Sequence, residues 1–377
     1  YQRFVEYNIQ DVELVDRLED KMKLIELCLT MAYDYKVNYT DVYSQVRCWD
    51  TIIYNHLLTK NIQIPPREDQ VKDTQYEGAY VKDPQLGLHN WIVSFDLNSL
   101  YPHLIMQYNI SPETFVGTEP KAVGVENFLD ERLNLKWAKD RNVTIAPNGA
   151  MFKRDKQGFL PELMEKMYTE RVVFKKKSIE AKKEYQKTKD PIYKNEISRC
   201  HNIQMAKKIS LNSAYGAIGN QYFRYFDVKQ AEAITLGGQL SIRWIERDVN
   251  KFMNKLLGTD NKNYVVASDT DSIYLKLDTL VEKVCKDKTP QQITDFLDKA
   301  AEEKIQKVID DSFKNLAEYV NAYQQKMIMK REAIANKGIW VAKKRYMMNV
   351  FDEEGIRFDI PKLKIMGVEA VKSSTPE

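Results

Sequence analysis

Apolar side chains recur at helical spacing through most of this chain. They stand three or four positions apart between Asn8 and Tyr35, which predicts helices there. The same spacing predicts helices over Ala231–Leu256 and Pro290–Lys326. A longer periodic stretch, Pro161–Asn220, is interrupted only near Asp190-Pro191, so it predicts an antiparallel pair of helices that project from the body of the protein.

Apolar runs rich in β-branched and aromatic residues predict strands. WIVSFDL, residues 91–97, is typical of a buried strand, and NSLYPHLIMQ after it predicts a helix capped by Asn98 or Ser99 with Pro102 in its first turn. NYVVASDTDSIYL, residues 263–275, predicts two strands that meet at a tight turn. IWVAKKRYMMNVFDEEGIRFD, residues 339–359, predicts a strand pair around the turn Asp352–Gly355.

Length and composition place few limits on function. A chain of 377 residues can bury a large core and predicts two or three structural units, with the polar, proline-bearing stretch 61–80 as a linker. The sequence contains no run of about eighteen apolar residues, so it predicts no membrane-spanning helix. Because the chain begins with Tyr1 and has no leader pattern, we interpret it as a piece of a longer protein. The cysteines form no CxxC pair, which indicates neither a disulfide framework nor a zinc site and fits a reducing cytoplasm: Cys28, Cys48, Cys200 and Cys285.

Positive charge is concentrated in one part of the chain. The net charge is +3, but thirteen Lys or Arg and seven Asp or Glu lie between Pro161 and Lys208, so this segment carries +6 and the remainder −3. Such concentration is expected of a phosphate-binding surface. A solvated helical hairpin of mixed charge is the alternative interpretation.

Two aspartates stand at the tip of the predicted hairpin in NYVVASDTDSIYL. On extended backbone Asp269 and Asp271 project from the same face, within about 7 Å of each other. Carboxylates that close repel each other and raise one pKa unless a cation lies between them, and oxygen ligands suit Mg²⁺ or Mn²⁺. A solvated hairpin tip without a cation remains the alternative.

Other motifs with two nearby aspartates can be compared with this one. An EF-hand loop starting at Asp269 requires Gly and Glu where the chain has Tyr274 and Leu280, so that motif is excluded. A phosphoaspartyl hydrolase of the DxDx[TV] type is nearer, although its fifth position is Ile273 here. It therefore stays as a competing interpretation.

A third aspartate strengthens the case for metal-assisted chemistry. Asp96 ends the predicted buried strand, and the helix after it offers N–H groups at Ser99, Leu100 and Tyr101 for an anion. One aspartate from this strand and two from the hairpin would surround a pair of divalent cations, with a triphosphate at the start of the helix. That set of groups is suited to two-metal phosphoryl transfer.

An ordered series of motifs resembles the family B DNA polymerases, and among them the replicative polymerases of T-even-type bacteriophages. The series covers nearly the whole chain: EYNIQDVELV, TQYEGAYV, SFDLNSLYPHLI, QYNISPET, KKISLNSAYGAIGN, SDTDSIY, KREAIA, KKRYMMNVFDEEG and KLKIMGVEAVKSSTPE. The resemblance implies an α+β fold, in which an antiparallel palm sheet carries a helical-hairpin fingers subdomain, without the thumb and most of the exonuclease domain. The implied division is 1–70 (end of the exonuclease domain and linker), 71–160 (palm), 161–220 (fingers), 221–370 (palm) and 371–377 (start of the thumb).

The resemblance also implies roles for palm residues. Asp96 and Asp271 are similar to the ligands that bridge both metals, the Leu97 carbonyl to a further ligand, and Asp269 to a neighbour that adjusts the metal geometry. Glu332 resembles a glutamate that binds an accessory metal. The incoming nucleotide is expected to contact three residues, with the last of them beneath the ribose: Ser99, Leu100 and Tyr101.

Further implied contacts lie outside these motifs. One helix face at steps of four and three is expected to bind the triphosphate and to meet the nascent base pair: Lys208, Asn212, Tyr215 and Gly216. Arg171 and Lys175, one turn apart, resemble phosphate clamps of the opposite helix. The KKRY segment is expected to hold the new duplex, and the turn before the palm to contact the template: Lys343, Lys344, Arg345 and Tyr346, and Tyr76, Gly78 and Ala79.

The sequence departs from the family pattern in three respects. Ala267-Ser268 stands where most relatives have Tyr-Gly, and His103 occupies the usual Ser position after Tyr-Pro. Tyr7 and Asp11 resemble the last of three exonuclease motifs, but the earlier motifs would lie before Tyr1, so we expect no 3′–5′ exonuclease activity from this chain.

The resulting hypothesis is a DNA-directed DNA polymerase that adds dNTPs to a primer 3′ end with two Mg²⁺ ions, for which Mn²⁺ can substitute. The implied partners are primer-template DNA, dNTPs, and a sliding clamp and other replisome proteins bound through missing regions; no membrane partner is expected. The implied location is the cytoplasm of an infected bacterial host. A phosphoaspartyl hydrolase and a non-catalytic nucleic-acid-binding module are the competing function classes.

Overall fold

The structure is a computed structural model that describes residues 1–72, 74–371 and 375. Its backbone contacts divide the chain into two compact units. The first unit comprises Tyr1–Thr74 and Phe159–Val228, and the second comprises Gln75–Gly158 and Lys229–Glu377. Each unit is therefore assembled from two separate stretches of sequence. The five-part division expected from the resemblance stays a prediction.

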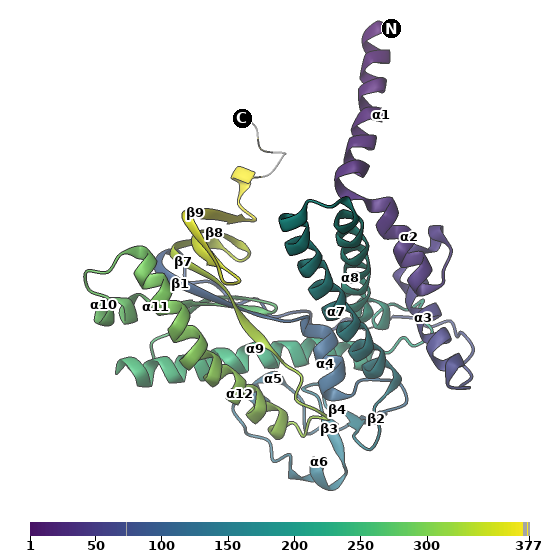
Figure 1. The fold of residues 1–377 in the computed structure, drawn as a ribbon. Coiled ribbons are helices and arrows are strands. Elements are labelled where there is room, and N and C mark those ends of the chain that lie inside the picture. The colour runs from purple at the N-terminus through teal and green to yellow at the C-terminus, as the bar shows by residue number, and fades with distance from the viewer. Residues whose placement is uncertain (73, 372–374, 376–377) are drawn as a thin grey trace. The chain divides into compact units, whose positions relative to one another are not determined.

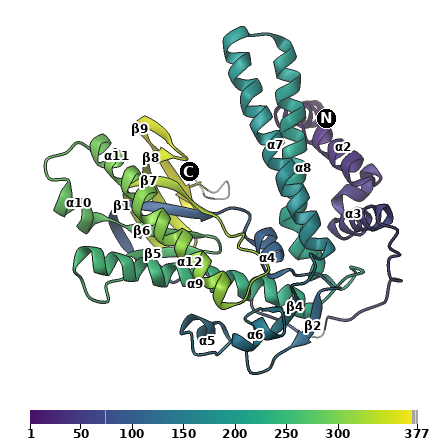
Figure 2. The ribbon, with the colours of Figure 1, turned by 60° about the horizontal axis from the view of Figure 1, so that its bottom comes forward.

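The first unit is helical among its described residues, and a long hairpin of α7 and α8 dominates it (Figure 2). Asp190 begins α8, because its Oδ1 accepts a hydrogen bond from the Ile192 N–H at 2.9 Å and Pro191 fits the first turn. The predicted antiparallel pair is confirmed. The elements of this unit are α1 (Gln2–Met22), α2 (Leu24–Tyr35), the 3-10 helix η1 (Tyr39–Tyr43), α3 (Gln45–Thr59), α7 (Phe159–Thr188) and α8 (Pro191–Ile218).

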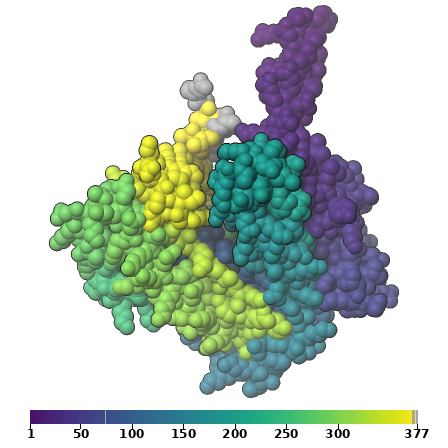
Figure 3. All heavy atoms as spheres, in the orientation of Figure 1, coloured from purple at the N-terminus to yellow at the C-terminus, as the bar shows by residue number. Residues whose placement is uncertain are grey.

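Helices α2 and α3 pack against α8, whereas α1 has no buried residue and projects from its unit (Figure 3). Two polar contacts fix this packing. The Tyr35 hydroxyl donates to the Ala206 carbonyl at 2.8 Å, and the Trp49 indole N–H donates to Ser213 Oγ at 3.1 Å. Both aromatic rings are almost completely buried, so each contact adds direction to apolar packing.

The second unit is built on a six-stranded antiparallel sheet with the order β5-β6-β1-β7-β8-β9 (Figure 1). Strand β1 lies inside this sheet, between β6 and β7, and its stretch of residues 92–95 is continuously buried. The strand bounds are β1 (Gly87–Leu97), β5 (Val265–Asp269), β6 (Ser272–Lys276), β7 (Met329–Ala342), β8 (Arg345–Glu353) and β9 (Ile356–Met366). The described residues thus form helices and antiparallel sheet, as the α+β class predicts.

Helices and a smaller sheet complete the second unit. Helices α10, α11 and α12 contact strands of the six-stranded sheet. The remaining bounds are α4 (Leu100–Tyr108), α5 (Val125–Leu129), α6 (Lys136–Asp140), α9 (Val228–Leu257), α10 (Asp278–Val284), α11 (Pro290–Ala300), the π-helix η2 (Ala301–Ile305), α12 (Gln306–Tyr319), the 3-10 helix η3 (Glu369–Val371), and a sheet of β2 (Phe115–Thr118), β4 (Ala150–Lys153) and β3 (Val143–Ile145) in that order.

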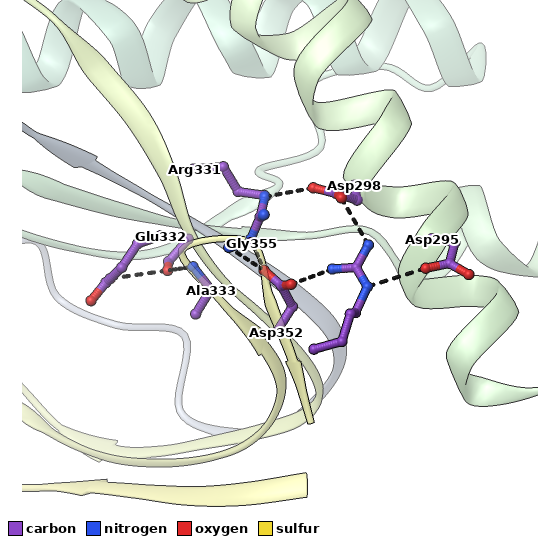
Figure 4. A network of polar contacts seen from close by, with 9 residues as sticks. Asp295, Asp298, Arg331, Glu332, Ala333, Asp352 and Gly355 are labelled. Atoms are coloured by element: carbon purple, nitrogen blue, oxygen red, sulfur yellow. Dashed lines mark hydrogen bonds and ion pairs between the residues drawn. The ribbon is translucent and has the colours of Figure 1, made fainter. Parts of the chain in front are cut away.

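A buried ion-pair network joins α11 to strands β7, β8 and β9 (Figure 4). Asp352 is fully buried and forms ion pairs with the guanidinium groups of Arg331 and Arg357. Arg331 Nε lies 2.8 Å from an Asp298 carboxylate oxygen, and Arg357 lies 2.8 Å from Asp298 and 3.1 Å from Asp295. The charges of two arginines are thus balanced by three aspartates, which fixes the helix on the sheet.

The structure corrects two predicted elements. The helix expected to reach Lys326 ends at Tyr319, because Asn321 takes a left-handed conformation with φ 49°. The predicted turn at Asp352–Gly355 joins the paired strands β8 and β9, but residues 339–359 also contain an earlier turn at Lys343-Lys344 between β7 and β8, so they belong to two hairpins. Most of the expected thumb start lies outside the described residues. Among the residues that are described, no helix is long and apolar enough to span a membrane, and the cysteines are unbridged.

Candidate active site

The register of the sheet brings the two predicted acidic segments together. Strands β1 and β6 are antiparallel, and Asp96 stands opposite Ser272. The Leu97 N–H donates to the Asp271 carbonyl at 2.8 Å. Asp96 and Asp271 therefore lie on neighbouring segments of one sheet, as the predicted geometry requires.

A tight turn holds Asp269 and Asp271 at the end of the hairpin. Thr270 takes a left-handed conformation with φ 55°, and the Asp271 N–H lies 2.6 Å from the Asp269 carbonyl. The Thr270 N–H donates to the Tyr80 carbonyl at 3.0 Å. The segment after Tyr80 runs alongside β5, where the Lys82 N–H donates to the Ser268 carbonyl and the Gln85 N–H donates to the Val266 carbonyl. Contacts from a distant segment thus support the turn that carries the acids.

The environment of the two acids disfavours their negative charge. Burial, together with the charges of Asp271 and Glu332, raises the pKa of Asp96 to about 7. Burial also raises the pKa of Asp271, and the charges of Asp269 and Glu332 act in the same direction. Neither Asp96 nor Asp271 forms an ion pair with any residue that the structure describes. A cation bound beside them would remove this unfavourable electrostatic energy.

Two lysines neutralise the other acids of the site. Lys344 Nζ lies 2.6 Å from Asp269 Oδ1. Lys364 Nζ lies 2.8 Å from one Glu332 oxygen, and Ser94 Oγ donates to the other at 3.1 Å. Asp271 lies close enough for its charge to act on Asp96, while Asp269 is directed to a lysine, so the expected convergence of the three carboxylates stays a prediction. Across the described part of the chain, no three His, Cys, Asp or Glu side chains stand ready around a common metal position.

The oxygen atoms at this edge of the sheet have the chemistry of a divalent-cation site. The candidate donors are the carboxylates of Asp96 and Asp271 and the carbonyl of Leu97, all of them hard oxygen ligands. Their fit rests on the raised pKa values of two acids that lack a cationic partner among the described residues. Asp269 or Glu332 would join such a site only after separation from Lys344 or Lys364.

Helix α4 begins directly after this acidic edge. Ser99 is its first flanking residue and takes a left-handed conformation with φ 47°, and the His103 N–H donates to the Ser99 carbonyl at 3.2 Å. The cap position is as predicted, although the Ser99 side chain makes no capping bond. The first turn of such a helix directs its N–H groups outward, as anion binding requires. His103 is buried, and its Nδ1 lies 3.0 Å from the Ser99 carbonyl oxygen, so the ring supports the first turn of α4.

Close packing against α9 supports Tyr101. A Cβ added to Gly238 would lie 3.4 Å from the Tyr101 ring and 3.4 Å from the Leu100 side chain. Gly237, its neighbour, faces Leu104 and Tyr108 in the same way at 3.5 Å. The half-buried Tyr101 ring therefore packs closely against this part of α9.

In the first unit, the expected nucleotide face of α8 is accessible. Lys208, Asn212 and Gly216 are exposed and Tyr215 is half-buried, whereas Lys207, Ser210, Leu211 and Ala214 on the other side of the helix are buried. On α7, Lys175 is exposed and Arg171 is half-buried, and burial lowers the pKa of the Arg171 guanidinium. The predicted helix face is confirmed, while the roles of its residues stay predictions.

The KKRY segment is divided between surface and core. Its basic residues are exposed and paired with acids: Lys343 with Asp83 at 3.0 Å, Lys344 with Asp269 at 2.6 Å and Arg345 with Glu369 at 3.0 Å. Tyr346 is only 7% exposed, and its hydroxyl lies 2.9 Å from the Tyr274 hydroxyl. Its ring packs in the sheet core against Trp340 and Tyr274, and the implied DNA contact of Tyr346 stays a prediction.

The turn with Tyr76 and Gly78 is tied to α9. Gln239 Nε2 donates to the Gly78 carbonyl at 2.8 Å. Gly78 and Ala79 are exposed, and the half-buried Tyr76 lines a hollow of about 640 Å³ that Asn148 and Arg243 also line. An added Cβ on Gly78 would meet no atom within 4 Å, so this turn leaves room for a ligand.

Sequence reasoning missed two residues next to the acids. Lys364 faces Glu332 from β9, and Ser94 links Glu332 to β1 and also accepts from the Ala333 N–H at 3.0 Å. Ser94 stands two residues before Asp96 and therefore shares its face of the strand, which is the signal that identifies it. Lys364 has no local signal, since its position depends on the pairing of β8 with β9.

Comparison with known proteins agrees with this arrangement. The sequence profile of DNA polymerase family B matches residues 37–287. The DNA-directed DNA polymerases of Escherichia phage RB69 and Enterobacteria phage T4 are 36% and 34% identical to this chain, in alignments that cover 100% of it and 47% of each phage protein. DNA polymerase 1 of Pyrococcus abyssi is 29% identical over 80% of the chain and 30% of the relative. The chain spans about half the length of the phage relatives that it matches. Because the profile covers well over half of the chain and both phage proteins align with all of it, the chain belongs to DNA polymerase family B.

Proposed function

We propose that this chain forms the palm and fingers of a DNA-directed DNA polymerase, which extends a primer 3′ end with dNTPs and releases pyrophosphate. The observation that carries the proposal is the juxtaposition of Asp96 and Asp271 across β1 and the β5–β6 turn, in a member of family B. The second unit corresponds to the palm, and the α7–α8 hairpin of the first unit corresponds to the fingers.

Asp96, Asp271 and the carbonyl of Leu97 would hold two Mg²⁺ ions, with Asp269 and Glu332 as neighbours. Ions bound there would lower the pKa of the primer 3′ hydroxyl and neutralise charge on the triphosphate. The protein positions the reactants. The start of α4 at Ser99, Leu100 and Tyr101 receives phosphates and sugar through outward N–H groups and the supported ring.

The fingers and the DNA-binding segments contribute positive charge. Arg171, Lys175 and Lys208 would bind the triphosphate from two helices, with Asn212, Tyr215 and Gly216 beside the nascent base pair. The exposed lysines and arginine of the KKRY segment would exchange their present acid partners for DNA phosphates. The turn with Tyr76 and Gly78 would contact the template. Primer-template DNA and dNTPs are the proposed substrates. Clamp and replisome contacts would use parts of the longer relatives, in an infected bacterial cell.

A primer-extension assay with the natural full-length protein tests this function. With Mg²⁺, the enzyme is expected to add only the dNTP complementary to the templating base. Release of phosphate from a phosphate monoester without DNA synthesis would favour the phosphoaspartyl hydrolase. Retention of primer-template DNA without turnover of any nucleotide would favour the non-catalytic binding module.

Tyr101→Ala is expected to weaken the discrimination against ribonucleotides. A ring packed under the deoxyribose leaves a 2′ hydroxyl neither space nor a hydrogen-bond partner, so its removal relieves both penalties. The ratio of kcat/KM for rNTP to that for dNTP should rise at least about tenfold, which is about 1.4 kcal/mol in relative transition-state binding.

Tyr101→Phe is the matched control, since it keeps the ring and should keep most of the discrimination. If Tyr101→Ala reduced the use of both nucleotide types equally, the ring would serve packing against Gly238 and not sugar selection.

A further inference from the structure

Lys207 of α8 is a buried cation held by two acids from two other helices. Its side chain is 9% exposed, and Nζ lies 2.9 Å from an oxygen of Asp34 on α2 and 2.7 Å from an oxygen of Glu170 on α7. Burial alone would lower the pKa of Lys207, but its hydrogen bonds to Glu170 and Asp34 raise it. The lysine therefore stays charged and joins three helices of the first unit at one point.

The position of this ion pair along the hairpin is informative. Glu170 directly precedes Arg171, and Lys207 directly precedes Lys208, so each partner is the neighbour of a proposed phosphate-binding residue. A helix advances about 1.5 Å per residue, so Arg171 and Lys208 lie within about that axial distance of the ion pair. The pair thus joins α7 and α8 at the level where both helices present positive charge.

The two lysines also have opposite surroundings. Lys208 is exposed, whereas Lys207, about 100° around the helix, is buried. The other polar contacts between α2 and α8 come from Tyr35, which donates to the Ala206 carbonyl and lies beside Ser210, and from Glu26, which accepts from Ser198 and Asn202 at 3.3 Å. Neither reaches α7. The ion pair between Lys207 and Glu170 links α8 directly to α7.

We propose that Lys207 is a positioning residue that fixes the axial register of α7 and α8, so that Arg171 and Lys208 converge on one triphosphate. The proposal rests on the proposed function and assigns Lys207, Glu170 and Asp34 a part in nucleotide affinity without contact to the nucleotide. Loss of the ammonium leaves two neighbouring carboxylates, 30% and 34% exposed, that repel each other, so the helices would shift apart at this level.

Lys207→Met retains most of the side-chain volume and removes the charge. In the natural full-length protein, we expect the KM for dNTP to rise at least about tenfold, because small displacements of positioning groups reduce binding of this kind. The kcat should stay within about twofold, since Asp96 and Asp271 are untouched. Lys207→Arg can pair with both acids and should restore the KM to within about threefold of wild type. Lys183→Met, at an exposed position on α7, is the matched control and should change neither constant.

Equilibrium titration with a dNTP, without turnover, separates this inference from the proposed function. Weaker binding by Lys207→Met with rescue by Lys207→Arg supports the positioning role, even if the wild-type protein were to add no nucleotide. A polymerase whose KM and dNTP affinity are unchanged by Lys207→Met, or whose kcat and melting temperature alone decrease, would overturn the inference and leave the proposed function intact. Absence of dNTP binding by the wild-type protein would overturn both.

Discussion

Asp96→Asn is expected to reduce primer extension by at least about a thousandfold, which is about 4 kcal/mol in the activation barrier. The substitution keeps the shape of the side chain and removes the charge that would hold the metal ions. Asp271→Asn should have an effect of similar size, because the two acids face one site across β1 and the hairpin turn. Single-turnover incorporation of one dNTP measures the loss without interference from product release.

Asp96→Asn should also stabilise the metal-free protein. Burial and the nearby acids raise the pKa of Asp96 from an ordinary value of 3.8 to about 7, so the folded state is penalised for ionising it. The stability that Asp96 contributes is therefore greatest below its unfolded pKa and is lost as the pH rises through about 7. In a chelator, the melting temperature of Asp96→Asn should exceed that of wild type at pH 8, and the gap should narrow toward pH 5. Added Mg²⁺ should raise the melting temperature of wild type more than that of the variant.

Two variants define the limits of this expectation. Asp269→Asn should cost less activity than Asp96→Asn, because Asp269 is bound to Lys344 and acts as a neighbour of the proposed ligands. Glu282→Gln changes an exposed acid of α10 and should leave both activity and stability unchanged. If Asp96→Asn kept a tenth or more of the wild-type rate, the proposed two-metal mechanism would be wrong.

Asp352→Ala is expected to destabilise the protein by about 3 to 5 kcal/mol, the usual cost of breaking a buried ion pair. Asp352 is fully buried between Arg331 and Arg357, and its carboxylate also accepts from the Gly355 N–H at 3.1 Å (Figure 4). Its removal leaves the two guanidinium groups to share Asp298 and Asp295 alone. Denaturant-induced unfolding monitored by tryptophan fluorescence measures the change.

A surface ion pair provides the comparison. Lys314 and Asp311 are 3.4 Å apart with side chains 64% and 54% exposed, so Asp311→Ala should change stability by less than about 1 kcal/mol. Asp352→Asn keeps a hydrogen-bond acceptor without the charge, so its loss of stability should lie between those of Asp352→Ala and Asp311→Ala. Equal small effects of Asp352→Ala and Asp311→Ala would mean that water enters the network and replaces the carboxylate.

Local chemistry accounts for the parts of the fold and the site that the sequence predicts. WIVSFDL is a short apolar run that ends at turn residues, and the polar SDTDS turn stands between two short apolar runs, so strand, turn and acid positions follow from neighbouring residues. The break between α7 and α8 follows from Asp190-Pro191, which caps one helix and cannot continue the other. Placement of Asp96 beside Asp271 required a relation between distant strands, and that expectation came from the chemistry of a two-metal site and was supported by the family resemblance.

Features that depend on distant pairing were not predicted. Strand β7, which begins at Met329, shows only a weak alternation of charged and apolar residues. Its partners in the sheet are β1 and β8. The turn at Lys343-Lys344 lacks the Gly or Asn that usually indicates a hairpin, yet Lys344 takes φ 60°. Tyr346 follows this turn, and the burial of its ring depends on the pairing of β7 with β8.

The backbone of residues 80–85 gives the hairpin of the aspartates a further property. Strand β5 is the outermost strand at its end of the sheet, and such edges can pair with strands of other molecules. Hydrogen bonds from Lys82 and Gln85 to Ser268 and Val266 occupy this edge without the formation of a regular strand. The cover protects the protein from edge-to-edge aggregation. An outermost hairpin can therefore carry the aspartates without also acting as a template for self-association.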